Sequence, residues 1–145
     1  MILFKSKRFL KKVALPKAWS YNIGLLLLRF NCALMLFHGW SKFNNFAKDS
    51  AEWPDPFNLG STFSYSFTVF CELVCTLFLV FGLFTRFALF PLIVLLLVIV
   101  LFIHEGEPIA DREHAILYLL LYAALFFTGP GEYSLDRLIY KKDYK

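Results

Sequence analysis

Apolar residues form four long stretches along the chain, separated by short polar segments. A helix needs about 20 apolar residues to cross a bilayer, so we predict membrane spans at about 21–40, 62–84, 87–104 and 113–128. The third stretch is apolar without interruption from Phe87 to Ile103, and its Pro91 is expected in the first turn of the helix, where proline is tolerated. Gly82 is the expected C-cap before the tight connection to the third span.

The two ends of the chain are polar, and we expect them to lie on the membrane surface. Apolar side chains within 2–13 fall in an arc of about 120°, which is typical of a basic amphipathic helix at an interface. Gly129, Pro130 and Gly131 end the fourth span, and Ser134 is placed to cap a last interfacial helix. The predicted fold class is all-α: an integral membrane four-helix bundle at 19–131, between a basic amphipathic segment at 1–18 and a cytoplasmic interfacial tail at 132–145.

Composition excludes other classes of protein. Hydrophobic residues make up 59% of the chain, compared with about 45–50% apolar residues in average soluble domains. Such a chain is neither disordered nor a soluble monomer. The net charge is +4, but the basic residues flank apolar spans, so the expected partner is the lipid bilayer and not nucleic acid.

The distribution of Lys and Arg predicts the orientation. With both termini and the connection at 82–86 on one side, that side holds eleven basic residues, and the other holds Lys42, Lys48 and Arg112. The second side also holds seven of the eleven acidic residues. We therefore expect both termini in the cytoplasm, the two longer loops outside, and a location in the inner membrane of a bacterium.

Two charged residues fall inside the predicted spans. A charge at bilayer depth costs about 2.5–3.5 kcal/mol and usually has a partner. Arg29 lies roughly 12 Å and Glu72 roughly 18 Å from the inner ends of two neighbouring antiparallel spans. We therefore predict an Arg29–Glu72 ion pair, which serves either as a structural link or as a charge held ready for a headgroup or a proton.

Three histidines gather at the expected outer end of the spans. His38 and Lys42 end the first span, His104 ends the third, and Glu113 and His114 begin the fourth. Histidines there are suited to relaying protons, hydrogen-bonding a quinone carbonyl, binding a metal, or contacting only headgroups and water. They are spread across helices with no pair at i, i+4, so a metal site is not predicted.

Two further patterns carry weaker chemical signals. His114, Tyr118 and Tyr122 recur every fourth residue along the fourth span, and line either a helix contact or a pocket for a flat ring. Apolar surroundings keep a thiol protonated, which disfavours a redox role for the three cysteines. These are Cys32, Cys71 and Cys75.

The order and spacing of these residues resemble the DoxX family. The matching positions cover roughly residues 22–138, and they are Arg29, His38-Gly39-x-x-Lys42, Glu72, Gly82-x-x-Thr85-Arg86, His104, Glu113 and Gly129-Pro130-Gly131-x-x-Ser134-Leu135-Asp136. The basic N-terminus and Trp53-Pro54-Asp55-Pro56 depart from the pattern. The resemblance implies a four-helix membrane bundle, in a family that includes membrane subunits of thiosulfate:quinone oxidoreductases.

The candidate residues fall into three groups. For chemistry we single out Glu72, Arg29, His38, His104 and Glu113, and for binding Lys42, Arg86, His114 and Tyr118. The expected structural positions are Gly39, Gly82, Thr85, Gly129, Pro130, Gly131, Ser134 and Asp136. We expect Arg86 to anchor to phosphates or to pair with Asp136 across the inner face.

Two functions follow as the main hypotheses, and a third, proton or ion conduction, would have only one buried acid and one buried base as its pathway. In the first, the chain is an inner-membrane subunit associated with quinone- or thiol-linked redox chemistry, with a quinone as the expected ligand. The sequence shows no recognisable flavin, haem or iron–sulfur motif, so the electrons come from a partner or from substrate thiols. In the second, the chain is a non-catalytic accessory subunit of a larger envelope complex. Both hypotheses predict other membrane subunits as partners, and a homo-oligomer is compatible with either.

Overall fold

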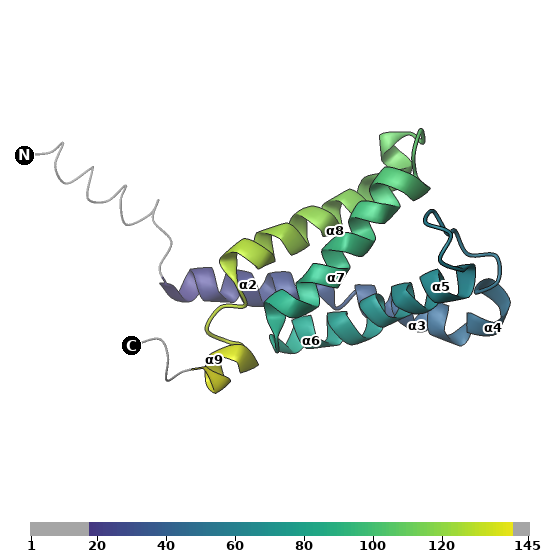
Figure 1. The fold of residues 1–145 in the computed structure, drawn as a ribbon. Coiled ribbons are helices and arrows are strands. Elements are labelled where there is room, and N and C mark those ends of the chain that lie inside the picture. Colours follow the sequence, from purple (N-terminus) through teal and green to yellow (C-terminus); the bar gives the residue numbers. More distant parts are fainter. Residues whose placement is uncertain (1–17, 141–145) are drawn as a thin grey trace, which may run out of the picture.

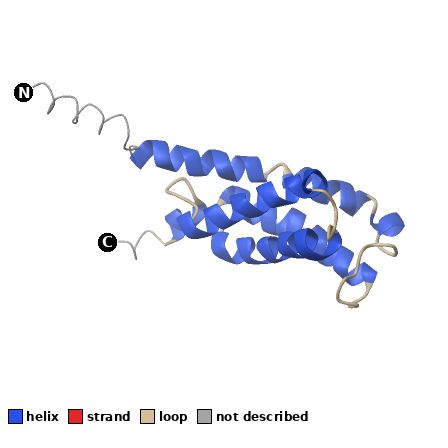
Figure 2. Ribbon diagram, turned by 90° about the horizontal axis from the view of Figure 1, so that it is seen from above, coloured by secondary structure: helices blue, strands red, loops and turns tan. Residues whose placement is uncertain are grey.

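The computed structural model describes residues 18–140, and every regular element within that range is a helix (Figures 1 and 2). The predicted amphipathic helix at 2–13 lies outside the described residues. The start of the first helix, the connection at 82–84 and the segment after the last long helix all lie at one end of the molecule, which we call the terminal end (Figure 1). The loops at 45–60 and 104–108 lie toward the opposite end, which we call the loop end.

The first span is longer than predicted and is interrupted. It consists of α2 (Ala18–Cys32) and α3 (Met35–Asn44), and it is followed by the short α4 (Phe46–Asp49). Between α2 and α3, the N–H groups of Ala33 and Leu34 donate to carbonyls three residues back, at 3.0 and 3.1 Å. This tighter hydrogen-bonding pattern replaces one turn of α-helix.

The second and third spans form a hairpin. The second runs from Ser61 to Phe81 through α5 (Ser61–Phe70), η1 (Cys71–Cys75) and α6 (Thr76–Phe81). The third consists of α7 (Thr85–Val98) and η2 (Ile99–Ile103). Both η segments are single turns of π-helix. Gly82 caps α6 as predicted, in the left-handed conformation (φ 65°) that glycine adopts without steric cost.

The structure corrects the position of Pro91. Because α7 begins at Thr85, Pro91 lies inside the helix and not in its first turn. Proline has no N–H, so the carbonyl of Phe87 lacks its usual helical donor at this point.

The last long helix is α8 (Ile109–Thr128), which packs along α7 and also contacts α2 and η2. A turn at 129–134 leads from it to α9 (Leu135–Ile139). Within the described residues, three helices are long and apolar enough to cross a membrane, namely Ala18–Asn44, Ser61–Phe81 and Thr85–Ile103. The length of α8 would also suffice, but its first turns carry three charged residues, Asp111, Arg112 and Glu113.

The core lies where the long helices face one another. Leu79, Leu89 and Leu125 come from three different helices, and each is fully buried. Large apolar side chains also cover the outside, where Phe87 is 81% and Phe37 is 73% exposed. An apolar exterior around a packed interior suits a lipid environment.

Candidate functional site

The site is built around an ion pair between α3 and the π-turn η1. Lys42 Nζ lies 2.5 Å from Glu72 Oε1, and the side chains are 23% and 4% exposed. The second carboxylate oxygen, Oε2, is buried and accepts no hydrogen bond from the described residues. Glu72 is therefore held through one oxygen, while the other has an unused acceptor position.

Local backbone geometry places Glu72 against α3. In the π-turn, the N–H of Thr76 donates to the carbonyl of Cys71, five residues back. Single π-turns inside helices occur frequently at functional sites. On the facing helix, a Cβ added to Gly39 would lie 2.9 Å from both the carbonyl carbon and the Cβ of Glu72. Only glycine allows the two backbones to approach this closely.

Aromatic side chains close the site toward the loop end. The hydroxyl of Tyr65, which is fully buried, donates to the carbonyl of Lys42 at 2.8 Å. The Trp53 ring centroid lies 5.5 Å from Lys42 Nζ and 4.9 Å from the Tyr65 ring, in an edge-on contact. The loop at 50–60 thus covers the cation as well as the aromatic ring beneath it, and a cation over an aromatic face is an attractive contact.

Asp55 fixes the shape of that loop. Its carboxylate accepts hydrogen bonds from the N–H of Gly60 (2.6 Å), the N–H of Leu59 (3.1 Å) and the hydroxyl of Ser64 (2.9 Å). Desolvation opposes ionisation of this carboxyl group, but the hydrogen bonds outweigh it and lower the pKa of Asp55. The Trp53-Pro54-Asp55-Pro56 segment is therefore a defined cover next to the ion pair.

The predicted Arg29–Glu72 ion pair is wrong. Side chains in a helix point back toward its N-terminus, so Arg29 reaches toward the terminal end, away from Glu72. Its Nη2 donates to the carbonyl of Tyr133 at 2.5 Å, and the residue is 1% exposed. For the same reason, the side chain of Lys42, which leaves α3 closer to the loop end than Glu72, points back toward the Glu72 carboxylate.

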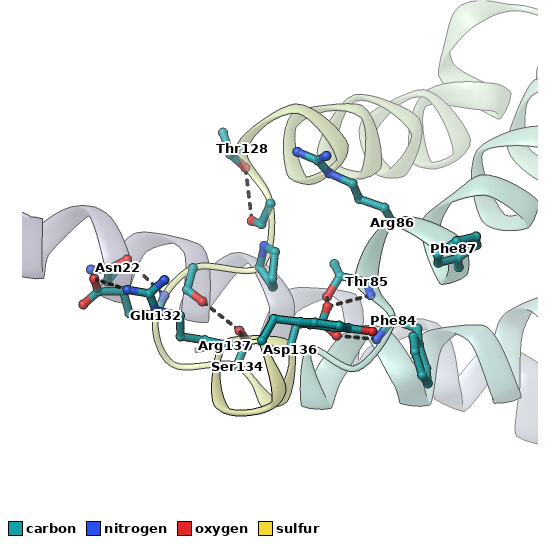
Figure 3. A pocket seen from close by; sticks show the side chains of 14 residues that line it. Asn22, Phe84, Thr85, Arg86, Phe87, Thr128, Glu132, Ser134, Asp136 and Arg137 are labelled. Atoms are coloured by element: carbon teal, nitrogen blue, oxygen red, sulfur yellow. Dashed lines mark hydrogen bonds and ion pairs between the residues drawn. The ribbon is translucent and has the colours of Figure 1, made fainter. Parts of the chain in front are cut away.

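A second polar cluster lies around Asp136 at the terminal end (Figure 3). The Asp136 carboxylate accepts from the N–H of Phe84 (2.7 Å), the N–H of Thr85 (2.9 Å) and the Thr85 hydroxyl (2.7 Å). It therefore caps the start of α7. The predicted Arg86–Asp136 pair is wrong, because Arg86 forms no ion pair within residues 18–140.

The turn at 129–134 is fastened to α2 and α9. The side-chain oxygen of Asn22 accepts from the N–H of Glu132 at 3.2 Å. Ser134 caps α9 as predicted, since its Oγ accepts from the N–H of Arg137 at 3.2 Å. A Cβ added to Gly82 would lie 2.3 Å from Arg29 Nη1 and 2.6 Å from the Cβ of Ser134. Close packing therefore joins the hairpin, the buried arginine and the last turn.

The other predicted site residues lie apart from the ion pair. His104 interacts with Glu107, and Tyr118 with Tyr122, whose ring centroid is 6.0 Å away. Three others have exposed side chains: His38, Glu113 and His114. Across 18–140, no three His, Cys, Asp or Glu side chains come together in a way that could hold a metal ion. The chemical and binding roles assigned to these residues stay predictions.

Sequence reasoning missed several members of both clusters. Neither the packing of Tyr65 and Trp53 around Lys42 nor the Tyr133 carbonyl has a local signature. The glycine at position 39 and the unusual loop at 53–56 were the available signals. All three cysteines are free and buried, and two of them bound the π-turn that carries Glu72.

Comparison with known proteins gives one match. Residues 24–105 match the family model described as DoxX, and these residues include Arg29, Lys42 and Glu72. Searches of curated proteins and of solved structures found no match.

Proposed function

The chain belongs to the DoxX family, and from this premise we propose that it is a membrane subunit associated with quinone- or thiol-linked redox chemistry, with Glu72 as its proton-exchanging group. The apolar helices and the family make it a multi-pass membrane protein. The proposal extends this to a four-helix bundle in which α8 is the fourth span. Its terminal end faces the cytoplasm of a bacterial cell, as the Lys and Arg distribution predicts.

The observation that carries the proposal is the unused oxygen of Glu72. A carboxylate that is 4% exposed would normally have all its acceptor positions occupied, or would be protonated. Here Lys42 stabilises the charge through one oxygen, and the other is available to a ligand or a proton. A buried polar atom without a partner calls for a functional or structural explanation, and binding of a substrate or a proton at this oxygen would supply one.

This arrangement fits the proton requirement of quinone chemistry. Reduction of a quinone to a quinol takes up two electrons and two protons, and oxidation of two thiols to a disulfide releases two of each. The Glu72 carboxylate would accept a proton released by the thiols and pass it to a quinone oxygen, returning to the carboxylate that Lys42 stabilises. Two such transfers would deliver the two protons of the quinol. The electrons come from the thiol substrate or from a partner subunit.

The test is Glu72→Gln, which keeps the shape of the side chain and removes its ability to exchange a proton. In membranes containing the full chain, we expect thiol-dependent reduction of a soluble ubiquinone analogue to fall about 10²-fold or more. Glu105→Gln, an exposed carboxylate near the loop end, is the matched control. An unchanged rate in Glu72→Gln, at equal protein level, overturns the proposal.

A second candidate function is that of a non-catalytic accessory subunit. The observation that favours it is the exposed polar side chain of His38 on the outward side of α3, beside Phe37 and Trp40, which are 73% and 58% exposed. A polar group on an otherwise apolar span is suited to contact another membrane protein. This alternative predicts that a protein partner co-purifies in mild detergent and is lost in His38→Leu, while Glu72→Gln leaves the complex intact.

A further inference from the structure

A pocket of about 440 Å³ opens at the terminal end, at the far end of the helices from Lys42 and Glu72. The start of α7, the end of α8, the turn that follows and α9 form its walls (Figure 3). Apolar groups from Phe84, Phe87 and Pro130 line part of it, and Thr128 and Arg86 contribute polar groups. The pocket is therefore amphipathic, and its apolar part borders the exposed surface of α7.

Arg86 supplies a positive charge that no residue within 18–140 compensates. Its side chain is exposed, and it forms no hydrogen bond or ion pair with the described residues. In Figure 3 it extends from the first turn of α7 toward the end of α8, beside the turn at Thr128. A guanidinium group offers two parallel donors that match a phosphate.

The nearby carboxylate does not neutralise this charge. Asp136 already accepts three hydrogen bonds from Phe84 and Thr85. It is also the acidic group that acts on the buried Arg29. Glu132 has a 65% exposed side chain, and its carboxylate lies 3.9 Å from Arg137. The pocket thus combines an available cation with acids that are engaged elsewhere.

Aromatic side chains extend the pocket toward the lipid phase. Phe84 precedes Arg86 and Phe87 follows it at the start of the third span. Phe84 is 46% exposed and Phe87 is 81% exposed. A ligand with a phosphate group and acyl chains would pair with the Arg86 cation and also cover the aromatic side chains. A water-soluble anion would leave the aromatic part uncovered.

We propose that this pocket binds the headgroup of one anionic phospholipid, with its phosphate on Arg86 and its acyl chains along Phe84 and Phe87. The proposal is independent of the redox function, because none of these residues contacts the Lys42–Glu72 pair. The lipid would join α7, α8 and α9 at the membrane surface. Anionic lipids concentrate at a basic cytoplasmic surface, which is the side that the charge distribution predicts for this end.

The experiment is a lipid titration of the full-length chain in detergent, followed by native mass spectrometry. The probes are dihexanoyl phosphatidylglycerol, phosphatidylcholine of the same chain length, and inorganic phosphate. We expect one phosphatidylglycerol per chain, bound at least tenfold more tightly than phosphatidylcholine. Arg86→Gln should weaken this binding about tenfold, because one charge-assisted phosphate contact is lost. Arg86→Lys should weaken it less, since the charge remains.

Lys48→Gln is the matched control, because it removes an exposed cation at the loop end and should leave binding unchanged. Thermal unfolding of each variant confirms that the fold is retained. Equal affinity for the two lipids, or undiminished binding in Arg86→Gln, overturns the proposal. Binding of inorganic phosphate as tightly as phosphatidylglycerol also overturns it, since the ligand would then be a free anion and not a lipid.

Discussion

The two polar clusters satisfy charge through different kinds of partner. At the terminal end, Arg29 and Asp136 are bound mainly by backbone groups, namely the Tyr133 carbonyl and the N–H groups of Phe84 and Thr85. Further along the helices, Glu72 is bound by one side chain, Lys42. Each cluster keeps one buried polar atom without a partner among the described residues, Arg29 Nε in the first and Glu72 Oε2 in the second. Backbone partners cannot leave, whereas a lysine side chain can move. This difference supports a structural role for the first cluster, and it fits the proton exchange that we propose for Glu72.

The largest effect is expected from Lys42→Met, which leaves the Glu72 carboxylate buried without a cation. Breaking a buried ion pair by removing one partner costs about 3–5 kcal/mol. We expect a loss of this size in reversible unfolding in mixed detergent micelles, with Lys48→Met near zero because Lys48 is exposed. The double variant Lys42→Met/Glu72→Met should recover most of the loss. A destabilised double variant would show that packing, and not the charge, causes the effect.

Asp136→Ala should come next in size. It removes the acceptor for two backbone N–H groups and a hydroxyl, together with the acid that faces Arg29. Loss of a helix cap alone costs about 1 kcal/mol. The variant also leaves the buried Arg29 without its nearby acid, which raises the expected loss of stability to about 2–3 kcal/mol. The same unfolding measurement checks it, with Glu105→Ala as the exposed control. Stability equal to that of the control would show that the Asp136 cluster does not stabilise the fold.

Two glycines in the first span offer a matched pair. Gly39→Ala forces a Cβ to within 2.9 Å of the Glu72 backbone, whereas Gly24→Ala meets nothing within 4 Å. Overpacking typically costs about 1–3 kcal/mol, and we expect Gly39→Ala to lose stability in that range. Gly24→Ala should be neutral or slightly stabilising, because alanine favours helix. Equal effects at the two positions would mean that α3 does not lie tightly against η1.

The smallest expected effect concerns the loop over the ion pair. The folded-state pKa of Asp55 is lowered, so its contribution to loop stability is present above its ordinary value of 3.8 and is lost as the pH falls through the folded-state pKa. Hydrogen exchange at the amides of Leu59 and Gly60, corrected for intrinsic rates, should accelerate below about pH 4. In Asp55→Asn, the exchange should be faster at neutral pH and should not change further on acidification. If exchange at these amides still accelerated on acidification in Asp55→Asn, Asp55 would not be the group that stabilises the loop.

Local chemistry explains what could be predicted from the sequence. Three of the four predicted spans, the helix cap at Gly82 and the Ser134 cap each depend on residues close together in the chain, and these were confirmed. The family was also recognised from residue spacing, and the family comparison confirms it.

Long-range geometry explains what could not be predicted from the sequence. Matching depth along two helices paired Arg29 with Glu72, but it ignored the direction in which each side chain leaves its helix. The break at residues 33–34 and the π-turns have no sequence motif, and they shift side chains by a fraction of a turn.

The hydrogen bond between Arg29 and the Tyr133 carbonyl has a consequence for biosynthesis, because it joins residues 104 positions apart. At roughly 5–20 residues per second, a ribosome needs roughly 5–20 seconds to reach Tyr133 after it has made Arg29. During that interval the first helix carries a cation whose final acceptor has not yet been translated. The nascent chain must therefore keep Arg29 near water or lipid phosphates until the last segment has been made. A chain truncated before residue 133 would never supply this acceptor.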